Sequence, residues 1–337
     1  MTNFDHMHKT GVVLLVLLLP AFGLAQTLLA THPPTSLRGL SAPSQGVVWT
    51  SGTGGTVGRS TDGGEHWTWI TVPGFAKRDF RDVEAFDALT AVIMAVDTPA
   101  VLLRTADGGA HWTEVFRDET PGMFLDAMDF KGAKGIVVGD PIAMDAGPRF
   151  YLAMTQDYGK TWTPFSGGIR PLADSGEGCF ASSGTNIRLL LRPALPYAFV
   201  SGGPKSRLFV NVSGTPLPLL QGAVSTGANS IAIDDNHWVI VGGDFAHDTI
   251  AKGNCVYSID GGVHWLQPRV PPHGYRSCVI HLSGAKWLCC GTSGIDISSD
   301  GGDHWTLLSR ESYHVAAASG HSVYLAGAHG RVARLDL

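Results

Sequence analysis

The sequence has few charges, and they form no runs. Asp, Glu, Lys and Arg make up 16% of its residues, and the formal net charge is −5. No stretch of lysine or arginine indicates a nucleic-acid or membrane surface. No sustained helical period of apolar residues occurs between residues 36 and 337. These absences argue against a nucleic-acid partner and a helical fold.

Signals for a cofactor or a metal are also missing. The glycine clusters SGTGGTVG and SGGPKS join strand to strand rather than strand to helix, and no haem attachment motif occurs. The cysteine spacings match no zinc site. We therefore expect no cofactor and no metal. An oxidoreductase that uses a quinone or a metal finds no support in the sequence.

Five cysteines are present, which leaves at least one thiol without an intramolecular partner. The tight connection SGAK joins the run that holds Cys278 to the run that holds Cys289 and Cys290. A hairpin there would set Cys278 against one of these two. The pattern fits a disulfide from Cys278 to Cys289 or Cys290, and it equally fits small buried hydrophobic residues.

The N-terminus has the features of a secretory signal. One lysine precedes the apolar run GVVLLVLLLP, which is too short to span a bilayer, and small residues precede Gln26. We expect residues 1–25 to be a signal peptide and residues 26–337 to be one exported domain. The mature chain is expected in the periplasm or outside the cell, as a monomer with no membrane span.

An eight-residue unit recurs along the chain. STDGGEHW at 60–67 returns as TADGGAHW, TQDYGKTW, SIDGGVHW and SSDGGDHW, and the intervals between its aspartates are 45, 50, 103 and 40 residues. The long interval corresponds to two periods, so we expect a repeat without the unit near residues 210–217. Periods of 40 to 50 residues built from short apolar runs are typical of propeller blades.

Counting the second apolar run of each repeat gives seven repeats, from GVVWTSG to VYLAGA. The sequence therefore predicts an all-β fold, a single seven-bladed β-propeller of four-stranded blades, with six blades as the competing count. The last repeat stops at its third strand, GRVARLDL. We expect the N-terminal strand QTLLATH to complete that blade and close the ring.

The repeated unit has a structural explanation. In the first copy, Gly63 and Gly64 can adopt positive φ in a hairpin, Asp62 can accept hydrogen bonds from the turn, and Trp67 can pack on the neighbouring blade. Histidines 66, 111, 264 and 304 lie one to a blade and cannot converge on one ion. The residues expected to fasten the turns are Asp62, Trp67, Asp107, Trp112, Asp157, Trp162, Asp260, Trp265, Asp300 and Trp305.

The unit resembles the Asp-box, or BNR repeat, of sialidases, other propeller glycosidases and the photosystem II stability/assembly-factor propellers. In those families the box lies on the rim, away from the functional face, and is not catalytic. Four boxes here carry histidine where threonine is usual, and Tyr158 interrupts the third. A single seven-repeat chain behind a signal peptide looks most like the assembly-factor propellers, over nearly all of residues 36–337.

The loops on the face opposite the boxes are unusually long, which is typical of a recognition surface. The resemblance to the assembly-factor propellers implies a non-enzymatic scaffold that binds a protein partner through that face. The partner is expected to be an envelope or membrane-associated protein, and a photosystem subunit only if the organism is phototrophic. The charged and aromatic candidates on this face are Arg78, Arg81, Asp82, Glu84, Arg170, Tyr275 and Arg310.

The alternative is a secreted glycoside hydrolase of the sialidase-like propeller type. The Phe-Arg-Ile-Pro motif typical of sialidases is absent. A two-carboxylate mechanism could use Asp140 and Asp244, and a sialidase site could use Arg276 in a triad with Arg81 and Arg170. The simpler interpretations are that Asp140 and Asp244 cap turns, and that Arg81 and Glu84 form an ion pair.

Overall fold

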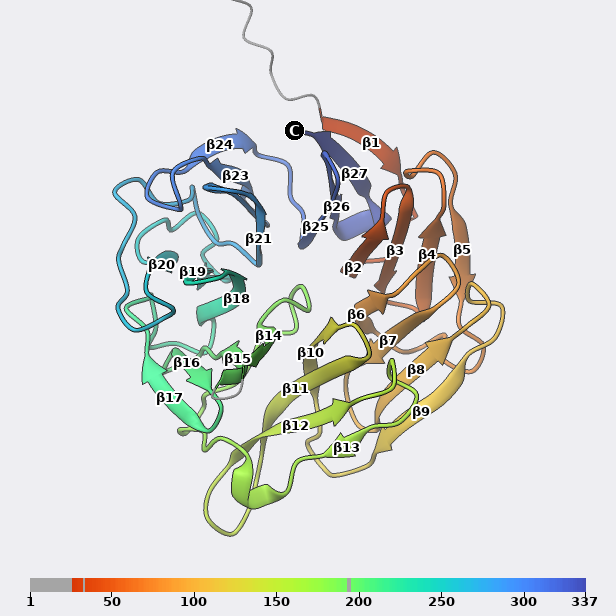
Figure 1. The fold of residues 1–337 in the computed structure, drawn as a ribbon, viewed down its shortest axis with the longest axis horizontal. Coiled ribbons are helices and arrows are strands. Elements are labelled where there is room, and N and C mark those ends of the chain that lie inside the picture. The colour runs from red at the N-terminus through yellow and green to blue at the C-terminus, as the bar shows by residue number, and fades with distance from the viewer. Residues whose placement is uncertain (1–25, 33, 193–194) are drawn as a thin grey trace, which may run out of the picture.

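A computed structural model describes residues 26–32, 34–192 and 195–337. Its strands form seven antiparallel sheets arranged in a ring, which confirms the predicted seven-bladed propeller (Figure 1). The first strand of each blade contacts the first strands of both neighbouring blades, so the inner strands form a closed ring. None of the helices in the described ranges is long and apolar enough to cross a membrane. The predicted signal peptide, residues 1–25, lies outside the described residues.

Each of the first six blades is a consecutive stretch of chain. Blade one comprises β2 (Leu37–Ser44), β3 (Val47–Gly52), β4 (Thr56–Ser60) and β5 (Thr68–Thr71). Blade two comprises β6 (Phe80–Ala85), β7 (Ala91–Ala95), β8 (Ala100–Thr105) and β9 (Thr113–Asp118). Blade three comprises β10 (Leu125–Lys131), β11 (Lys134–Ile142), β12 (Arg149–Thr155) and β13 (Thr163–Pro164). Blade four comprises β14 (Ile187–Arg192), β15 (Leu195–Val200), β16 (Arg207–Val210) and β17 (Ser213–Pro216). Blade five comprises β18 (Thr226–Asp234), β19 (His237–Asp244) and β20 (Cys255–Ser258). Blade six comprises β21 (Cys278–Ser283), β22 (Lys286–Gly291), β23 (Gly294–Ser298) and β24 (Thr306–Ser309).

The seventh blade combines both ends of the described chain. It contains β25 (Val315–Ser319), β26 (Ser322–Ala326), β27 (Val332–Asp336) and β1 (Gln26–Ala30). β1 is the outer strand and runs antiparallel to β27, with Gln26 opposite Leu335. The two ends of the described chain therefore lie side by side (Figure 1).

The fifth blade departs from the predicted four strands. Its sheet has three strands, and only an isolated bridge between Tyr257 and Leu266 marks the place of a fourth. Pro268 follows two residues later, and Pro271 and Pro272 come after it. Proline has no N–H to donate to a sheet, so the outer strand predicted from Trp265 onward stops after one pair of hydrogen bonds.

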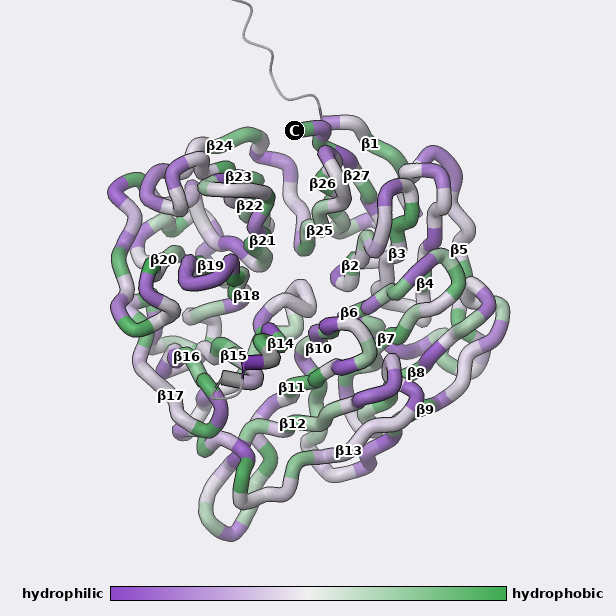
Figure 2. The backbone as a smooth tube through the Cα atoms, in the orientation of Figure 1, coloured by the Kyte–Doolittle hydropathy of each residue, from purple (hydrophilic) through white to green (hydrophobic). Residues whose placement is uncertain are grey.

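The core lies between adjacent blades. All five residues of β7 are buried, because neighbouring blades cover this sheet on both faces. Trp49 and Val57 of the first blade pack with Ile93 of the second, and Leu102 of the second packs with Val137 of the third. Figure 2 shows hydrophobic stretches along the strands and many hydrophilic stretches in the connections. Burial between blades therefore stabilises the ring without a single central core.

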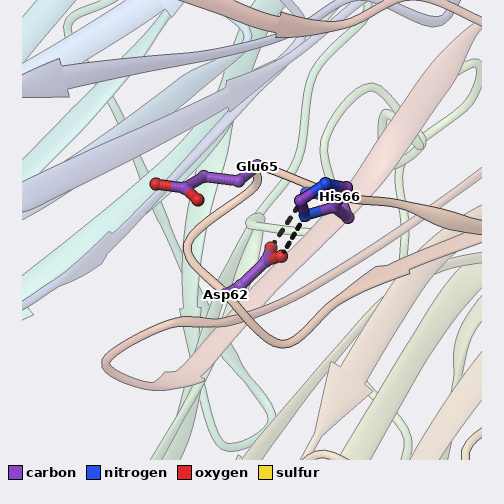
Figure 3. A group of neighbouring side chains, drawn as sticks. All are labelled: Asp62, Glu65 and His66. Carbon is purple, nitrogen blue, oxygen red and sulfur yellow. Dashed lines mark hydrogen bonds and ion pairs between the residues drawn. The ribbon is translucent and has the colours of Figure 1, made fainter.

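The first repeated box, STDGGEHW, forms the expected turn between β4 and β5. Gly63 and Gly64 have φ values of 78° and 92°. Ser60 Oγ donates to Asp62 Oδ1 at 2.8 Å, and the backbone N–H of His66 donates to the same oxygen at 3.0 Å. The His66 ring contacts Asp62 Oδ2 at 2.7 Å, and no contact is drawn to Glu65 (Figure 3). Histidine thus forms a second contact that holds the box aspartate.

The third box shows which interaction histidine replaces. Thr161 Oγ1 donates to Asp157 Oδ2 at 2.7 Å, the same length as the histidine contacts in the other boxes. Tyr158 takes a glycine position with φ 60°. Its ring packs edge-on against Phe86 with the ring centroids 5.3 Å apart, a contact that glycine could not make.

All five cysteines are buried free thiols in the structure. Cys278 lies directly opposite Cys290 in the register of β21 and β22, and both belong to one hydrophobic cluster. Cys289 belongs to a different cluster, with Cys255. If a disulfide forms, this register therefore selects Cys290 over Cys289, and the bond itself stays a prediction.

Candidate functional site at the mouth of the ring

Four inner strands carry a register irregularity at the same position, near the end where the chain enters the blade. The shifts lie between Leu37 and Gly39, Phe80 and Asp82, Leu125 and Ala127, and Ala228 and Ser230. The residues inside them are Arg38, Arg81, Asp126 and Asn229. A bulge turns a side chain away from the regular alternation, and all four of these residues line one cavity.

We call this cavity, of about 460 Å³, the mouth pocket. It lies on the face opposite the Asp-boxes, where the inner strands begin. Residues 179–186, the mouth loop, cross the ring beneath it, and Figure 1 shows the loop that precedes β14 reaching toward the centre. Ser183 Oγ donates to the carbonyl oxygen of Ser277 in blade six at 2.7 Å, and Arg38 Nη1 donates to that of Ser182 at 3.3 Å. The mouth loop therefore forms a fixed floor.

One side of the mouth pocket is basic. Arg81 Nε donates to Asp79 Oδ2 at 2.8 Å, and its guanidinium lies 5.8 Å from the centroid of the Phe124 ring. Burial, and then the charge of Arg81, lower the pKa of Arg38. Burial, and then Arg38, lower the pKa of His314 to about 3, so this imidazole is neutral at physiological pH. The two arginines therefore supply the positive charge of this side.

The other side is acidic. Asp126 is fully buried, and neither of its carboxylate oxygens has a hydrogen-bond partner of ordinary geometry among the described residues. Asp140 Oδ1 accepts one hydrogen bond, from the backbone N–H of Cys179 at 2.9 Å. Burial raises the pKa of Asp140 to about 6. Burial, and then the charge of Asp140, raise the pKa of Asp126 well above its usual range.

Aromatic rings complete the wall. Phe180 packs edge-on against Phe245 with centroids 5.6 Å apart, and Phe245 packs against Tyr275 with centroids 6.4 Å apart. Phe124 lies beneath Arg81, and all four rings line the mouth pocket. Tyr275 is fixed by the hydrogen bond from its hydroxyl to Asn229 Oδ1 at 2.8 Å.

A second hollow, of about 530 Å³, adjoins the mouth pocket and shares Asp140, Cys179 and Phe180 with it. We call it the outer groove. It lies over blades three and four, and the ion pair between Glu177 and Arg207 stiffens its wall. Large apolar side chains are exposed in the loops of blades three to five on the same face; they are Met144, Ile169, Leu172, Val224, Phe245 and Ile250.

The structure brings three of the sequence candidates to the mouth pocket, namely Arg81, Asp140 and Tyr275. Arg310 is exposed in the connection from β24 to β25. Arg81 pairs with Asp79 rather than with Glu84.

Three other candidates are held by hydrogen bonds outside the mouth pocket, and the fourth, Glu84, has its pKa shifted by burial. Arg78 donates to the carbonyls of Val96, Asp97 and Pro99, and Arg170 donates to that of Phe165. Asp82 is buried and accepts backbone N–H groups from Val83 and Met128. Burial, and then Asp82, raise the pKa of Glu84 well above its usual range.

The residues proposed for glycosidase chemistry do not converge. Asp244 accepts the N–H of Ala246 at 2.9 Å and contacts His247 Nδ1 at 2.8 Å, as a turn cap does. Arg276 is fully buried in an ion pair with Asp296. Only Asp140 of the three lines the mouth pocket.

Sequence reasoning missed Arg38, Asp126 and the three phenylalanines of the aromatic wall, Phe124, Phe180 and Phe245. A signal was present, because Leu37–Arg38, Phe80–Arg81 and Leu125–Asp126 each place a charge directly after the first buried residue of an inner strand. Regular alternation does not indicate where that charge points. The bulges that set its direction are visible only in the strand register.

No protein-family model matches the chain, and no curated protein matches it. Solved structures do. YCF48 bound to D1 peptide has a TM-score of 0.60 at 16% identity, covering 95% of this chain and 96% of that one. YCF48 from Cyanidioschyzon merolae has a TM-score of 0.62 at 17% identity, covering 92% and 98%. The WD40 β-propeller domain of Doa1 has a TM-score of 0.59 at 12% identity, covering 92% and 96%. At these identities the likeness shows the fold.

Proposed function

We propose that the chain is an exported, non-enzymatic scaffold that binds an extended segment of a protein partner across the mouth pocket and the outer groove. The observation that carries this proposal is the joining of two hollows on the face opposite the boxes, one lined by charged and aromatic side chains and the other lined mainly by polar residues, with large apolar side chains exposed in the loops of the same face. A rigid ring with long loops on one face suits such binding. YCF48, which shares the fold, has been solved with a bound peptide.

The partner under this proposal is an envelope or membrane-associated protein, and a photosystem subunit if the organism is phototrophic. The chain would then belong with the assembly-factor-like Asp-box propellers. Export itself is tested by N-terminal sequencing of the protein from its own cells. A mature chain beginning at Gln26 supports export, and an intact Met1 in the cytoplasmic fraction contradicts it.

Peptide binding is tested by selecting a displayed library of random 12-residue peptides on purified residues 26–337. Enriched peptides are then synthesised and titrated against two matched variants. Phe245→Ala removes an aromatic ring from the mouth, whereas Leu89→Ala removes an exposed apolar side chain from a β6–β7 hairpin beside the second box. We expect affinity to fall at least about tenfold for Phe245→Ala, since an aromatic side chain buried at the centre of an interface often contributes about 2 kcal/mol or more, and to stay unchanged for Leu89→Ala. Equal loss in both variants, or no enrichment, contradicts the proposal.

A second candidate function is glycoside hydrolysis, and one observation favours it. Asp126 and Asp140 are two carboxyls in one aromatic-lined cavity, and the raised pKa of Asp140 is typical of a general acid. A panel of fluorogenic sialosides and β-glycosides tests it, with a propeller sialidase as the positive control. Turnover that Asp140→Asn abolishes supports hydrolysis, and no turnover with an active control eliminates it for these substrates.

A further inference from the structure

Asp126 is in an unusual position for a carboxylate. Its side chain is fully buried, yet it lines a cavity open to solvent, and its oxygens have no hydrogen-bond partner of ordinary geometry within the described chain. The backbone N–H groups of Asp140 and Ala181 lie near the carboxylate and lower its pKa slightly, but neither makes a hydrogen bond of ordinary geometry to it. The N–H of Asp140 is donated to the carbonyl oxygen of Phe124 at 2.9 Å. Buried polar groups nearly always have partners, and one without a partner lowers stability. Such a group at the wall of a cavity suggests that its partner is a ligand.

The charges around Asp126 define what that ligand must be. Asp140 lies close enough to raise the pKa of Asp126 further, so two acidic groups face one space. Among the described residues, no lysine or arginine nitrogen lies within 4.0 Å of either carboxylate. The charge of Arg81 lowers the pKa of Asp126, but its guanidinium is already held by Asp79 and by the Phe124 ring. The acidic side of the mouth pocket therefore lacks a positive charge.

The surrounding rings fit the same ligand. Phe180, Phe245 and Tyr275 form a continuous aromatic wall in the same pocket as the two carboxylates, and Phe180 directly follows Cys179, whose N–H binds Asp140. Aromatic faces attract ammonium and guanidinium groups, most strongly where water is excluded. The methylene stem of a lysine or arginine side chain also packs against such rings while its charged end reaches a carboxylate. A metal ion would need more oxygen ligands than this wall offers.

We propose that the acidic side of the mouth pocket binds a lysine or arginine side chain of the partner, with Asp126 and Asp140 as the charge partners and Phe180, Phe245 and Tyr275 as the wall. This inference rests on the proposed peptide-binding function and specifies its chemistry. A cation would give Asp126 the partner that it lacks in the free chain. The position of the basic residue would then fix the register of the partner segment over the mouth.

The test repeats the peptide selection on wild-type chain, on Asp126→Asn and Asp140→Asn alone and combined, and on Glu65→Gln, a control at an exposed box turn. We expect wild type and Glu65→Gln to enrich lysine or arginine at one fixed position, and the double variant to lose that preference. Replacing this residue by norleucine in a synthetic peptide should weaken binding to wild type by about tenfold or more, the usual effect of losing a charged hydrogen bond. It should weaken binding to the double variant by less than about threefold. Melting curves confirm that each variant is folded.

The outcomes separate the two claims. Enriched peptides without a fixed basic residue, or a basic preference that survives in the double variant, overturn this inference and leave peptide binding intact. No enrichment on any chain overturns the proposed function itself. Binding that requires calcium, and that EDTA and the double variant both abolish, would assign the carboxylates to a metal ion and also overturn the inference.

Discussion

Replacing Asp140 by asparagine should make the protein more stable at neutral pH, by an amount that depends on pH. Burial raises the pKa of this carboxyl from 3.8 to about 6. A rise of about two pKa units, at about 1.36 kcal/mol for each, corresponds to about 3 kcal/mol. Because the folded pKa is above the unfolded value, this cost is absent well below pH 4. It grows as the pH rises toward 6 and is complete above that value.

Asparagine isolates this effect because it keeps the local contact. Its carbonyl oxygen can accept the N–H of Cys179 as Asp140 Oδ1 does, at 2.9 Å in the wild type. Gly178 leaves the room for this group, since a Cβ there would lie 2.7 Å from Asp140 Oδ1. Asparagine is the same size, so no new clash arises.

The assay is urea unfolding of wild type and Asp140→Asn at pH 4.5 and at pH 7.5. We expect the difference in free energy of unfolding between the two chains to shift by about 2 kcal/mol in favour of the variant over this range. Asp126, Arg81 and Arg38 are the other charged groups that line this pocket. Because the charge of Asp140 raises the pKa of Asp126, its removal in the variant also relieves that repulsion, which acts in the same direction. A difference that does not change with pH, or a variant that is less stable at pH 7.5, would refute the assigned environment of Asp140.

Three further predictions concern other parts of the ring. Asp126→Asn should raise the free energy of unfolding at pH 7.5 by about 1–3 kcal/mol, because burial raises the pKa of this carboxyl and asparagine has no charged form to bury, and urea unfolding that shows a loss would contradict this. Hydrogen bonds from His111 lower the pKa of Asp107 to about 2. The stabilisation from this box is therefore present above pH 4 and is lost as the pH falls toward 2. Asp107→Asn should flatten this part of the acid-unfolding curve. Trp305→Ala should lower the free energy of unfolding by about 3–5 kcal/mol, since this side chain is 2% exposed. Trp265→Ala should lower it clearly less, because this side chain is only partly buried. Equal losses of stability in calorimetry would be inconsistent with this packing.

The fold could be predicted because its signals are local and repeated. Each box carries its own turn chemistry, as Asp62 and Gly63 show, and the seven second apolar runs give the number of blades. The fifth blade was over-predicted because Trp265 resembles the other strand starts, while the prolines after it remove the donors that a fourth strand needs.

The mouth pocket could be predicted only in part. The long loops indicated the face on which Arg81, Asp140 and Tyr275 line the mouth pocket, but loop length does not distinguish a side chain that lines a cavity from one held by its own turn, as Asp244 is. Asp126 was missed because it reads as an ordinary strand residue, and its place at the wall of the cavity depends on a register shift between Leu125 and Ala127. Such long-range geometry has no signature in a single sequence.

Hydrogen–deuterium exchange of residues 26–337, with and without a selected peptide, tests the central claim most directly. The account predicts slower exchange in the mouth loop, residues 179–186, and around Phe245, with no change at the box turns, since the peptide would cover the mouth pocket. Protection confined to the box turns, or a library that yields no peptide for the wild-type chain, would contradict it.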